Sequence, residues 1–566
     1  MGAVTSRFLS PSWSESKVIS TAPGPIKGRK YTFPKGSVEA FLGIPYAKQP
    51  LKELRFQKPQ KPDPWTEVKV CQEFGHRCPH EELLLEKLNN VAEKGEDCLH
   101  LNVFAPDWSP ESAEQPDGFA VMVFIHGGGF SVHSSSHYGD YGICEVLCTK
   151  DVIVVTINYR LGFFGFSAGD DIPSNIGLWD QTMALQWVRD NIHAFNGNPN
   201  NITVFGQSAG GASVDFLTLS PHSQNLFKKA IPMAGTALCS FPHNEKKHVK
   251  QVCIDYAVKQ GFKPTKENES PFEFLRTLPA SALECGIFGS TKVNRNGKLD
   301  LTPIFDGDFF PKPFDQLRKE APTKIIMTGV TEHEGLLFVA LRPPRMNVSQ
   351  EADRLIEREL AQYKIQNIDE IKKKLTSIYT NGTNPNSKKD LNKVAVKIVS
   401  DIFINNGAWN YADTMTQLGH TVYQYCFEYY NSKDFGLLGF LLPFKASTHG
   451  SEMPYLFKRG VIAKFHPNED DLKMVEAFTT FFTNFAKHDN PNGPEPSPQI
   501  WKPLIPGDTL KYLSINLDKI RTCDNLHNAR PLVWRSLIRD ALQNQEKPNE
   551  KQELTEYVKA REQGKL

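Results

Sequence analysis

The stretch that most constrains the fold is GQSAG, residues 206–210, which joins a short apolar run to a segment compatible with a helix. The apolar run, 202–205, has the β-branched and aromatic composition of a buried strand. Where a strand turns directly into a helix, small residues are needed on both sides because the two segments approach closely. The side chain of Ser208 is then exposed at the positive end of a helix dipole. The sequence therefore predicts a reactive serine in a fold that alternates strands and helices.

Other segments support the same class of fold. Further strand-like apolar runs lie at 121–125, 152–157, 324–330 and 421–427. Between them are helix-compatible segments, with apolar residues at helical spacing in 178–192 and on one face of a later helix through Leu472, Val475, Phe478, Phe482 and Phe485. Strands that alternate with helices predict an α/β fold, with a large, mostly parallel central sheet flanked by helices and with insertions. Functional residues are then expected in the loops at the carboxyl ends of the strands.

Composition excludes several classes of function. The 566 residues contain 65 Lys and Arg against 64 Asp and Glu, which gives a net charge of +1, so no nucleic-acid partner is expected. The longest apolar runs, such as 119–125, are far shorter than the roughly 18 residues of a membrane span. Ten cysteines without metal-ligand spacing predict neither a disulfide scaffold nor a metal site. We expect no metal and no organic cofactor, and nothing in the sequence sets an oligomeric state.

The N-terminus lacks the apolar core of a secretory signal peptide, so we expect a cytoplasmic protein. Gly2, followed by Ser6, fits the N-myristoylation pattern. A single myristoyl chain binds membranes only weakly, so lipidation of Gly2 predicts loose, peripheral membrane attachment. We expect an N-terminal segment at 1–15, one large domain at 16–541 and a polar tail at 542–566.

A nucleophilic serine needs a base, an acid that orients the base, and donors for an oxyanion. The glycine-rich loop 126–130 follows one predicted strand, the acidic segment 331–335 follows another, and HGSE at 449–452 follows a third. Exposed backbone N–H groups of such a glycine loop can join that of Ala209 to hold an oxyanion. On chemistry alone any of the 16 histidines can be the base. Position after a strand favours His449.

The chain resembles the type-B carboxylesterases, most closely those of nematodes and insects. The resemblance rests on motifs that occur in one order along nearly the whole chain: FLGIPYAKQP, EDCLHLNVF, GGGF, NYRLGFFGF, VFGQSAGGASV, GVTEHEG and HGSEMPYLF. It implies an α/β-hydrolase fold with Ser208 as nucleophile, Glu334 as acid and His449 as base. It also implies an oxyanion hole formed by the backbone N–H groups of Gly128, Gly129 and Ala209.

The same resemblance implies a set of supporting residues. They are the ion pairs Arg55 with Glu96 and Arg160 with Asp180, and the first disulfide of the family, Cys78 with Cys98. We interpret these residues as structural only. Because disulfides persist mainly in oxidising compartments, we expect the two thiols of this chain to be reduced.

Two departures from the family pattern bear on the substrate. Gln207 stands where many relatives have Glu, and Leu88 stands where cholinesterases have the tryptophan that holds choline. The resemblance therefore implies a serine carboxylesterase that hydrolyses neutral or hydrophobic esters, small-molecule substrates, through an acyl-enzyme. Two alternatives stay open: an acyltransferase that uses the same triad to pass the acyl group to an alcohol or amine, and a non-enzymatic interaction scaffold.

Overall fold

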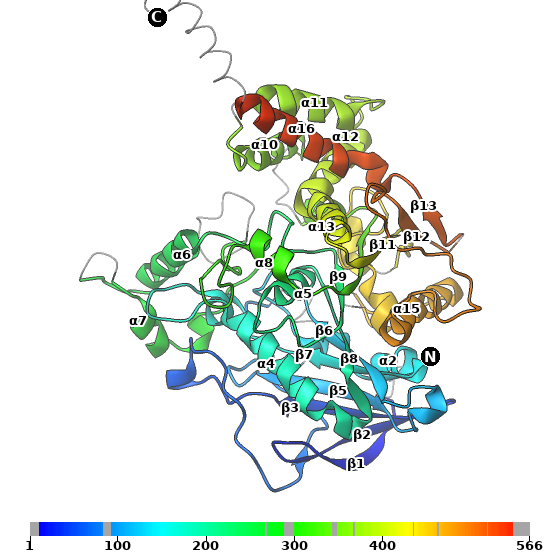
Figure 1. The fold of residues 1–566 in the computed structure, drawn as a ribbon. Coiled ribbons are helices and arrows are strands. Elements are labelled where there is room, and N and C mark those ends of the chain that lie inside the picture. Colours follow the sequence, from blue (N-terminus) through cyan, green and yellow to red (C-terminus); the bar gives the residue numbers. More distant parts are fainter. Residues whose placement is uncertain are drawn as a thin grey trace, which may run out of the picture.

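The computed structural model describes residues 11–546 except 83–91, 266–268, 288–298, 342–347, 366–367, 434, 461–462 and 518. Its framework is one large mixed sheet with helices on both faces (Figure 1). The strands are β1 Ser14–Ser20, β2 Pro25–Phe33, β3 Gly36–Pro45, β4 Lys69–Val70, β5 His100–Pro106, β6 Phe119–Ile125, β7 Val152–Ile157, β8 Gly197–Gln207, β9 Lys229–Met233, β10 Ile325–Thr331, β11 Thr421–Phe427, β12 Tyr512–Ile515 and β13 Arg521–Cys523.

The helices lie between and after these strands. They are α2 Tyr141–Val146, α3 Gly162–Phe166, α4 Ile176–Asn191, α5 Ala209–Leu219, α6 Lys246–Lys259, α7 Phe272–Thr277, α8 Phe314–Glu320, α9 Gly335–Ala340, α10 Val348–Ala361, α11 Ile368–Thr380, α12 Lys388–Ser400, α13 Asn406–Gln417, α14 Met453–Phe457, α15 Glu469–His488 and α16 Arg530–Glu546. The described part of the tail begins within α16, and residues 547–566 lie outside the described residues.

The order of the strands places the loops of interest together. Within the described residues the sheet runs β1-β2-β3-β5-β7-β6-β8-β9-β10-β11-β12-β13, with β4 beside β2. From β7 to β12 in this order, each strand is parallel to the next. The pairs β1-β2, β2-β3, β3-β5, β5-β7 and β12-β13 are antiparallel. The carboxyl ends of β6, β8, β10 and β11 therefore lie along one edge of the sheet. The mostly parallel α/β fold expected from the sequence is confirmed.

The buried central strands separate two hydrophobic cores. Along β6, the side chains of Val121 and Val123 enter one core, and those of Met122 and Phe124 enter the other, because successive side chains of a strand point to opposite faces. Helices α4 and α5 contribute to the first core, and α2, α14 and α15 contribute to the second. Every residue of β6 is buried, which explains why this strand reads as a continuous apolar run.

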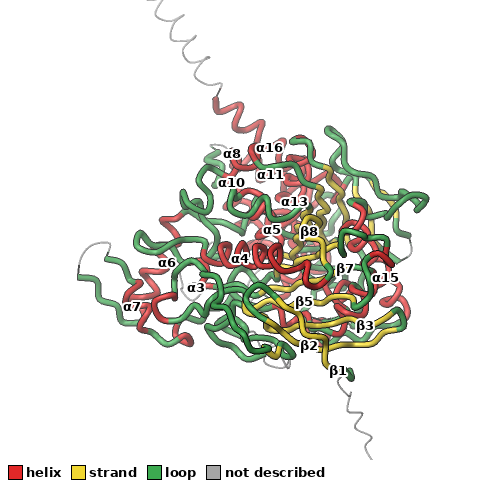
Figure 2. Tube along the Cα trace, turned by 60° about the horizontal axis from the view of Figure 1, so that its bottom comes forward, coloured by secondary structure: helices red, strands yellow, loops and turns green. Residues whose placement is uncertain are grey.

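Most of the helices between β10 and β11 form a layer of their own. Helices α9 to α12 pack together with the side chain of Trp534 from α16 in a separate hydrophobic cluster. In both views α10 and α11 lie far from β1, β2 and β3 (Figures 1 and 2). This layer is built from the long charged segment between β10 and β11, which reads as helical in the sequence.

The amphipathic helix expected around Phe478 is α15, and its apolar face is buried except at Leu472. Val475, Phe478, Phe482 and Phe485 are buried, whereas Leu472 is 43% exposed. Leu472 is the fourth residue of the helix, close to the capping box that Asn468 and Asp471 form. The buried part of the predicted apolar face therefore begins after Leu472.

Candidate active site

Ser208 lies at the sharp turn between β8 and α5. Its φ of 60° and ψ of −124° are rare for a residue with a side chain, and such strain clusters at functional sites. The backbone is fixed there because the N–H of Ser208 donates to the carbonyl of Met233 on the neighbouring strand β9, at 2.8 Å. The side chain of Ser208 is partly exposed, so its hydroxyl can be reached from outside.

Glycine is required at this turn by close approach of the backbone. A Cβ on Gly206 would lie 2.6 Å from the carbonyl carbon of Gly210, and one on Gly210 would lie 2.1 Å from the carbonyl oxygen of Ile125. Both distances are shorter than real Cβ atoms show. These two contacts explain the small residues on both sides of the serine, and they hold the turn against the end of β6.

Three side chains from three loops form a continuous hydrogen-bonded chain. His449 Nε2 lies 2.8 Å from Ser208 Oγ, and His449 Nδ1 lies 2.6 Å from Glu334 Oε2. The other carboxylate oxygen, Oε1, accepts the backbone N–H of Thr331 at 2.6 Å, and Glu334 is fully buried. A buried carboxylate at Nδ1 holds the proton on that nitrogen, which leaves the Nε2 lone pair to accept from the serine hydroxyl.

The loops that bear the acid and the histidine are bonded to each other. The hydroxyl of Thr448 accepts the backbone N–H of Leu337 at 2.9 Å and donates to the carbonyl of Glu334 at 3.3 Å. The backbone N–H of His333 donates to the carbonyl of Ser447 at 3.2 Å. The orientation of the acid toward the histidine is therefore set by the backbone as well as by the side chains.

The three predicted oxyanion donors come from two neighbouring loops. Gly128 and Gly129 have φ values of 107° and 59°, conformations that favour glycine. Ala209 is the first residue of α5, and the first backbone bond to the serine carbonyl comes only from Ala212. The N–H of Ala209 thus belongs to the first helical turn, whose N–H groups have no partner within the helix.

A second buried carboxyl group stands beside the triad. Glu452, at the start of α14, is 2% exposed, and its Oε2 has no hydrogen-bond partner. Burial, together with the negative charge of Glu334, raises the pKa of Glu452 well above its usual range. Burial and the neighbouring carboxylate therefore both favour the uncharged form of Glu452. Sequence reasoning gave it no role, and its position three residues after His449 is the only signal that could have found it.

Apolar side chains also lie close to the triad and the oxyanion loop. The ring of Phe338 lies 4.9 Å from that of His449, and a Cβ built on Gly129 would touch Ile287 and Leu299. Leu88 falls in 83–91 and so lies outside the described residues. The described surroundings favour an uncharged substrate.

The predicted supporting ion pairs are both formed. Arg55 makes a bidentate pair with Glu96, and its guanidinium also donates to the carbonyl of Leu278 at 2.7 Å. Asp180 accepts from Nε and from a terminal guanidinium nitrogen of Arg160, at 2.8 and 2.6 Å, and from its backbone N–H at 3.0 Å. Arg160 and Asp180 are 2% and 0% exposed. Neither pair touches the triad through any of these bonds.

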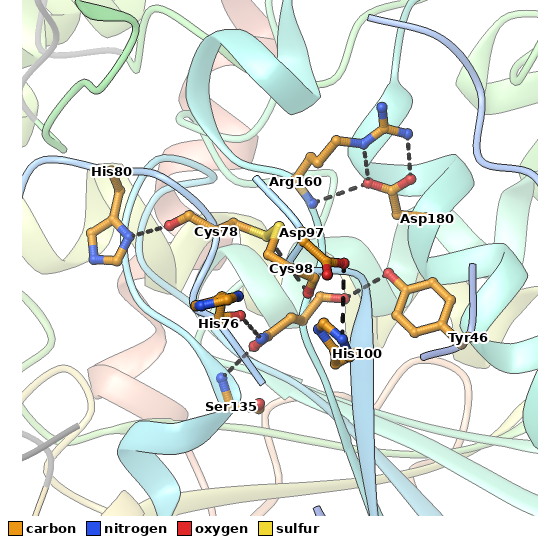
Figure 3. Close-up of a disulfide and its surroundings, with 11 residues drawn as sticks. Tyr46, His76, Cys78, His80, Asp97, Cys98, His100, Ser135, Arg160 and Asp180 are labelled. Atoms are coloured by element: carbon orange, nitrogen blue, oxygen red, sulfur yellow. Dashed lines mark hydrogen bonds and ion pairs between the residues drawn. A yellow bond between two sulfur atoms is a disulfide. The ribbon is translucent and has the colours of Figure 1, made fainter. Parts of the chain in front are cut away.

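Cys78 and Cys98 are joined in a disulfide, with the side chain of His80 and the Arg160–Asp180 pair nearby (Figure 3). The expectation of reduced thiols is therefore wrong for this structure. The pairing implied by the family resemblance is present, whereas the expectation of reduction rested on the compartment and not on the distance between the two cysteines.

Alkylation can test this bond. Unfolded protein purified without reductant should take up eight alkyl groups, because eight of the ten cysteines are free, and ten after reduction. Replacing Cys78 and Cys98 together by alanine should lower the free energy of unfolding by about 3 kcal/mol, the loop-closure entropy of a bridge of this span. Ten alkyl groups without reduction, read by intact mass, would contradict the bond.

Two further observations concern the described residues alone. In the described ranges between 11 and 546, no group of three or more His, Cys, Asp or Glu side chains is placed to hold a metal ion. None of the described helices combines the length and the apolar character needed to cross a membrane. Gly2, the predicted lipidation site, lies outside the described residues.

Comparison with known proteins defines the family. A model of the carboxylesterase family matches residues 15–534. Esterase cest-33 of Caenorhabditis elegans is 40% identical over 531 residues, covering 92% of this chain and 95% of that protein. Gut esterase 1 of C. elegans is 29% identical, covering 92% of each chain. The cholinesterase of Mus musculus is 30% identical, covering 92% of this chain and 87% of that protein.

The chain belongs to the carboxylesterase family. Its fold is the α/β-hydrolase fold of that family, and it is a carboxylic ester hydrolase. The resemblance to type-B carboxylesterases of invertebrates is confirmed by the nematode relatives.

Proposed function

We propose that this protein hydrolyses neutral or hydrophobic carboxylic esters through an acyl-enzyme on Ser208, with His449 as base and Glu334 as the acid that orients it. The observation that carries the proposal is the hydrogen-bonded chain from Ser208 through His449 to buried Glu334, at 2.8 and 2.6 Å. It is the arrangement that a hydroxyl needs to become a nucleophile near neutral pH.

Acylation begins when Ser208 Oγ attacks the ester carbonyl carbon and its proton passes to His449 Nε2. The carbonyl oxygen becomes an oxyanion, which accepts from the backbone N–H groups of Gly128, Gly129 and Ala209. Glu334 stays ionised and stabilises the imidazolium through Nδ1–H. His449 then gives the proton to the alkoxide leaving group, so that an alcohol departs and the acyl group remains on the serine.

Deacylation repeats these steps with water in place of the serine hydroxyl. His449 Nε2 takes a proton from the water as the water oxygen attacks the acyl carbonyl carbon. The oxyanion that forms again accepts hydrogen bonds from the three backbone N–H groups. Collapse of the intermediate returns that proton to Ser208 Oγ and releases a carboxylic acid, which ionises at neutral pH. The cycle needs no other reactant.

The preference for uncharged esters follows from the residues around the triad. Gln207 is neutral, burial disfavours a charge on Glu452, and the ring of Phe338 lies 4.9 Å from that of His449. With Glu334 already hydrogen bonded to the histidine, these groups offer a cationic alcohol no free negative charge. Apolar neighbours stabilise an apolar acyl or alcohol group instead.

Product analysis with p-nitrophenyl butyrate tests this proposal. We expect butyrate and p-nitrophenol in equal amounts, and kcat/KM at least about tenfold above that for butyrylthiocholine. Addition of ethanol as a competing acceptor should convert only a minor share of the acyl groups into ethyl butyrate.

Two results would contradict the proposal. Folded protein that turns over neither ester would oppose ester hydrolysis as its activity. Transfer of nearly every acyl group to dilute ethanol would favour the acyltransferase that uses the same triad.

Cytoplasmic location, with loose membrane attachment through a lipid on Gly2, is part of the proposal and is tested by metabolic labelling with a myristate analogue.

A further inference from the structure

A neutral amide shares the nitrogen that activates the serine. Gln207 Nε2 lies 3.3 Å from His449 Nε2, and Ser208 Oγ lies 2.8 Å from the same atom. Gln207 is 6% exposed, and its side chain lies between two glycines. Its Oε1 would be 3.2 Å from a Cβ on Gly127, and its Nε2 would be 3.7 Å from a Cβ on Gly450. The amide is thus enclosed between the oxyanion loop and the histidine loop.

The direction of this bond follows from the protonation of the ring. With Nδ1–H donated to Glu334, Nε2 has one lone pair and no proton, so the amide of Gln207 must donate. Two donors, the amide and the serine hydroxyl, therefore compete for one lone pair. When the ring takes the serine proton, Nε2 becomes a hydrogen-bond donor. The amide of Gln207 can then bond to it only if the side chain rotates so that Oε1 faces Nε2 and accepts.

The charges around the histidine do not compete with this amide. Glu334 is the carboxyl group hydrogen bonded to the ring, and burial, with the negative charge of Glu334, raises the pKa of Glu452. Burial, with the cations Lys397, Arg530 and Lys393, lowers the pKa of His333 to about 4, so this ring is uncharged at neutral pH. Burial raises the pKa of Cys239 to about 12, which keeps its thiol neutral.

We propose that Gln207 is a positioning residue that donates its amide N–H to His449 Nε2 and thereby sets the pH range over which the histidine can act as a base. This inference rests on the proposed function and adds to it the control of that site by a neighbouring side chain. A donor to the lone pair stabilises the neutral ring. The amide therefore keeps the base available at lower pH than the Glu334–His449 pair alone would.

Two variants separate this role from packing. The carboxylate in Gln207→Glu can only accept a hydrogen bond, so it stabilises the protonated ring of His449. The acid limb of the kcat/KM profile should therefore move to higher pH by about 1 unit or more. Methionine in Gln207→Met keeps the length but offers no N–H, so the limb should move up by about half a pH unit. As a control, Gln72→Glu adds the same charge where the amide donates to the carbonyl of Gly28, and it should leave the profile unchanged.

A second readout does not depend on ester turnover. The proton between His449 Nδ1 and Glu334 should give a downfield NMR signal that is lost in His449→Gln, and its chemical shift should change with pH as the ring is protonated. The midpoint of that change should rise in both Gln207 variants, and more in Gln207→Glu. Midpoints within about 0.2 pH units of the parent in both variants would overturn the proposal.

The two readouts distinguish the possible failures. A raised NMR midpoint without any turnover that depends on Ser208 would support the role of Gln207 and oppose the proposed function. If both variants lowered kcat at every pH but moved neither the acid limb of kcat/KM nor the NMR midpoint, Gln207 would only pack between the loops. That result would overturn the inference.

Discussion

Replacement of Ser208 by alanine should lower kcat for p-nitrophenyl butyrate by a factor on the order of 10⁵ to 10⁶, because the acyl-enzyme can no longer form. The loss should appear in kcat rather than KM, since the hydroxyl bonds the substrate covalently only as the reaction proceeds. Steady-state kinetics on protein of verified fold measures it.

The matched control for this variant is Ser213→Ala on the same helix. Ser213 Oγ accepts from the amide of Gln181 at 3.1 Å and is fully buried, so this change removes a buried hydroxyl without touching the triad. Activity within a few fold of the parent is expected for Ser213→Ala. If both variants lost activity equally, the elbow serine would have no special role.

Replacement of Arg160 by methionine should reduce the free energy of unfolding by about 3–5 kcal/mol, the effect of leaving a buried carboxylate without its partner. Asp180 is 0% exposed and accepts two hydrogen bonds from the guanidinium of Arg160. The midpoint of urea unfolding, followed by intrinsic fluorescence, reports the change.

Two further variants serve as controls for this measurement. Lys374→Met removes an ion pair with Glu370 in which both side chains are more than half exposed, at 55% and 57%, and it should shift stability by only about 0.3–0.5 kcal/mol. The double change Arg160→Met with Asp180→Leu should recover part of the loss, because the buried charge is then gone. Equal effects of Arg160→Met and Lys374→Met would contradict the structural role of the buried pair.

The strands and the serine turn were predictable because their constraints are local. The strand at 421–427 has the same bounds in the structure as in the prediction, and GQSAG marks the turn because a Cβ at Gly210 would meet the end of β6. The family resemblance then gave residue numbers for the acid and the base, and the structure places Glu334 and His449 within bonding distance of each other.

Long-range contacts were not predictable in the same way. Gln207 and His449 are 242 positions apart, and nothing local to either residue indicates that the amide approaches Nε2. Leu472 is exposed although it lies on the apolar face of α15, because helical periodicity does not show which turns of a helix the rest of the fold covers. The oxidation state of Cys78 and Cys98 was wrongly predicted because the prediction relied on the expected cellular compartment. The fold brings the two cysteines together, and the sequence alone does not show that distance.

The most direct test of the central claim is intact mass after treatment with a fluorophosphonate, followed by peptide mapping. If Ser208 is the nucleophile, one adduct should form on the peptide that contains it, and Ser208→Ala should form none. An adduct that persists in Ser208→Ala, or that maps to another residue of the folded protein, would contradict the account.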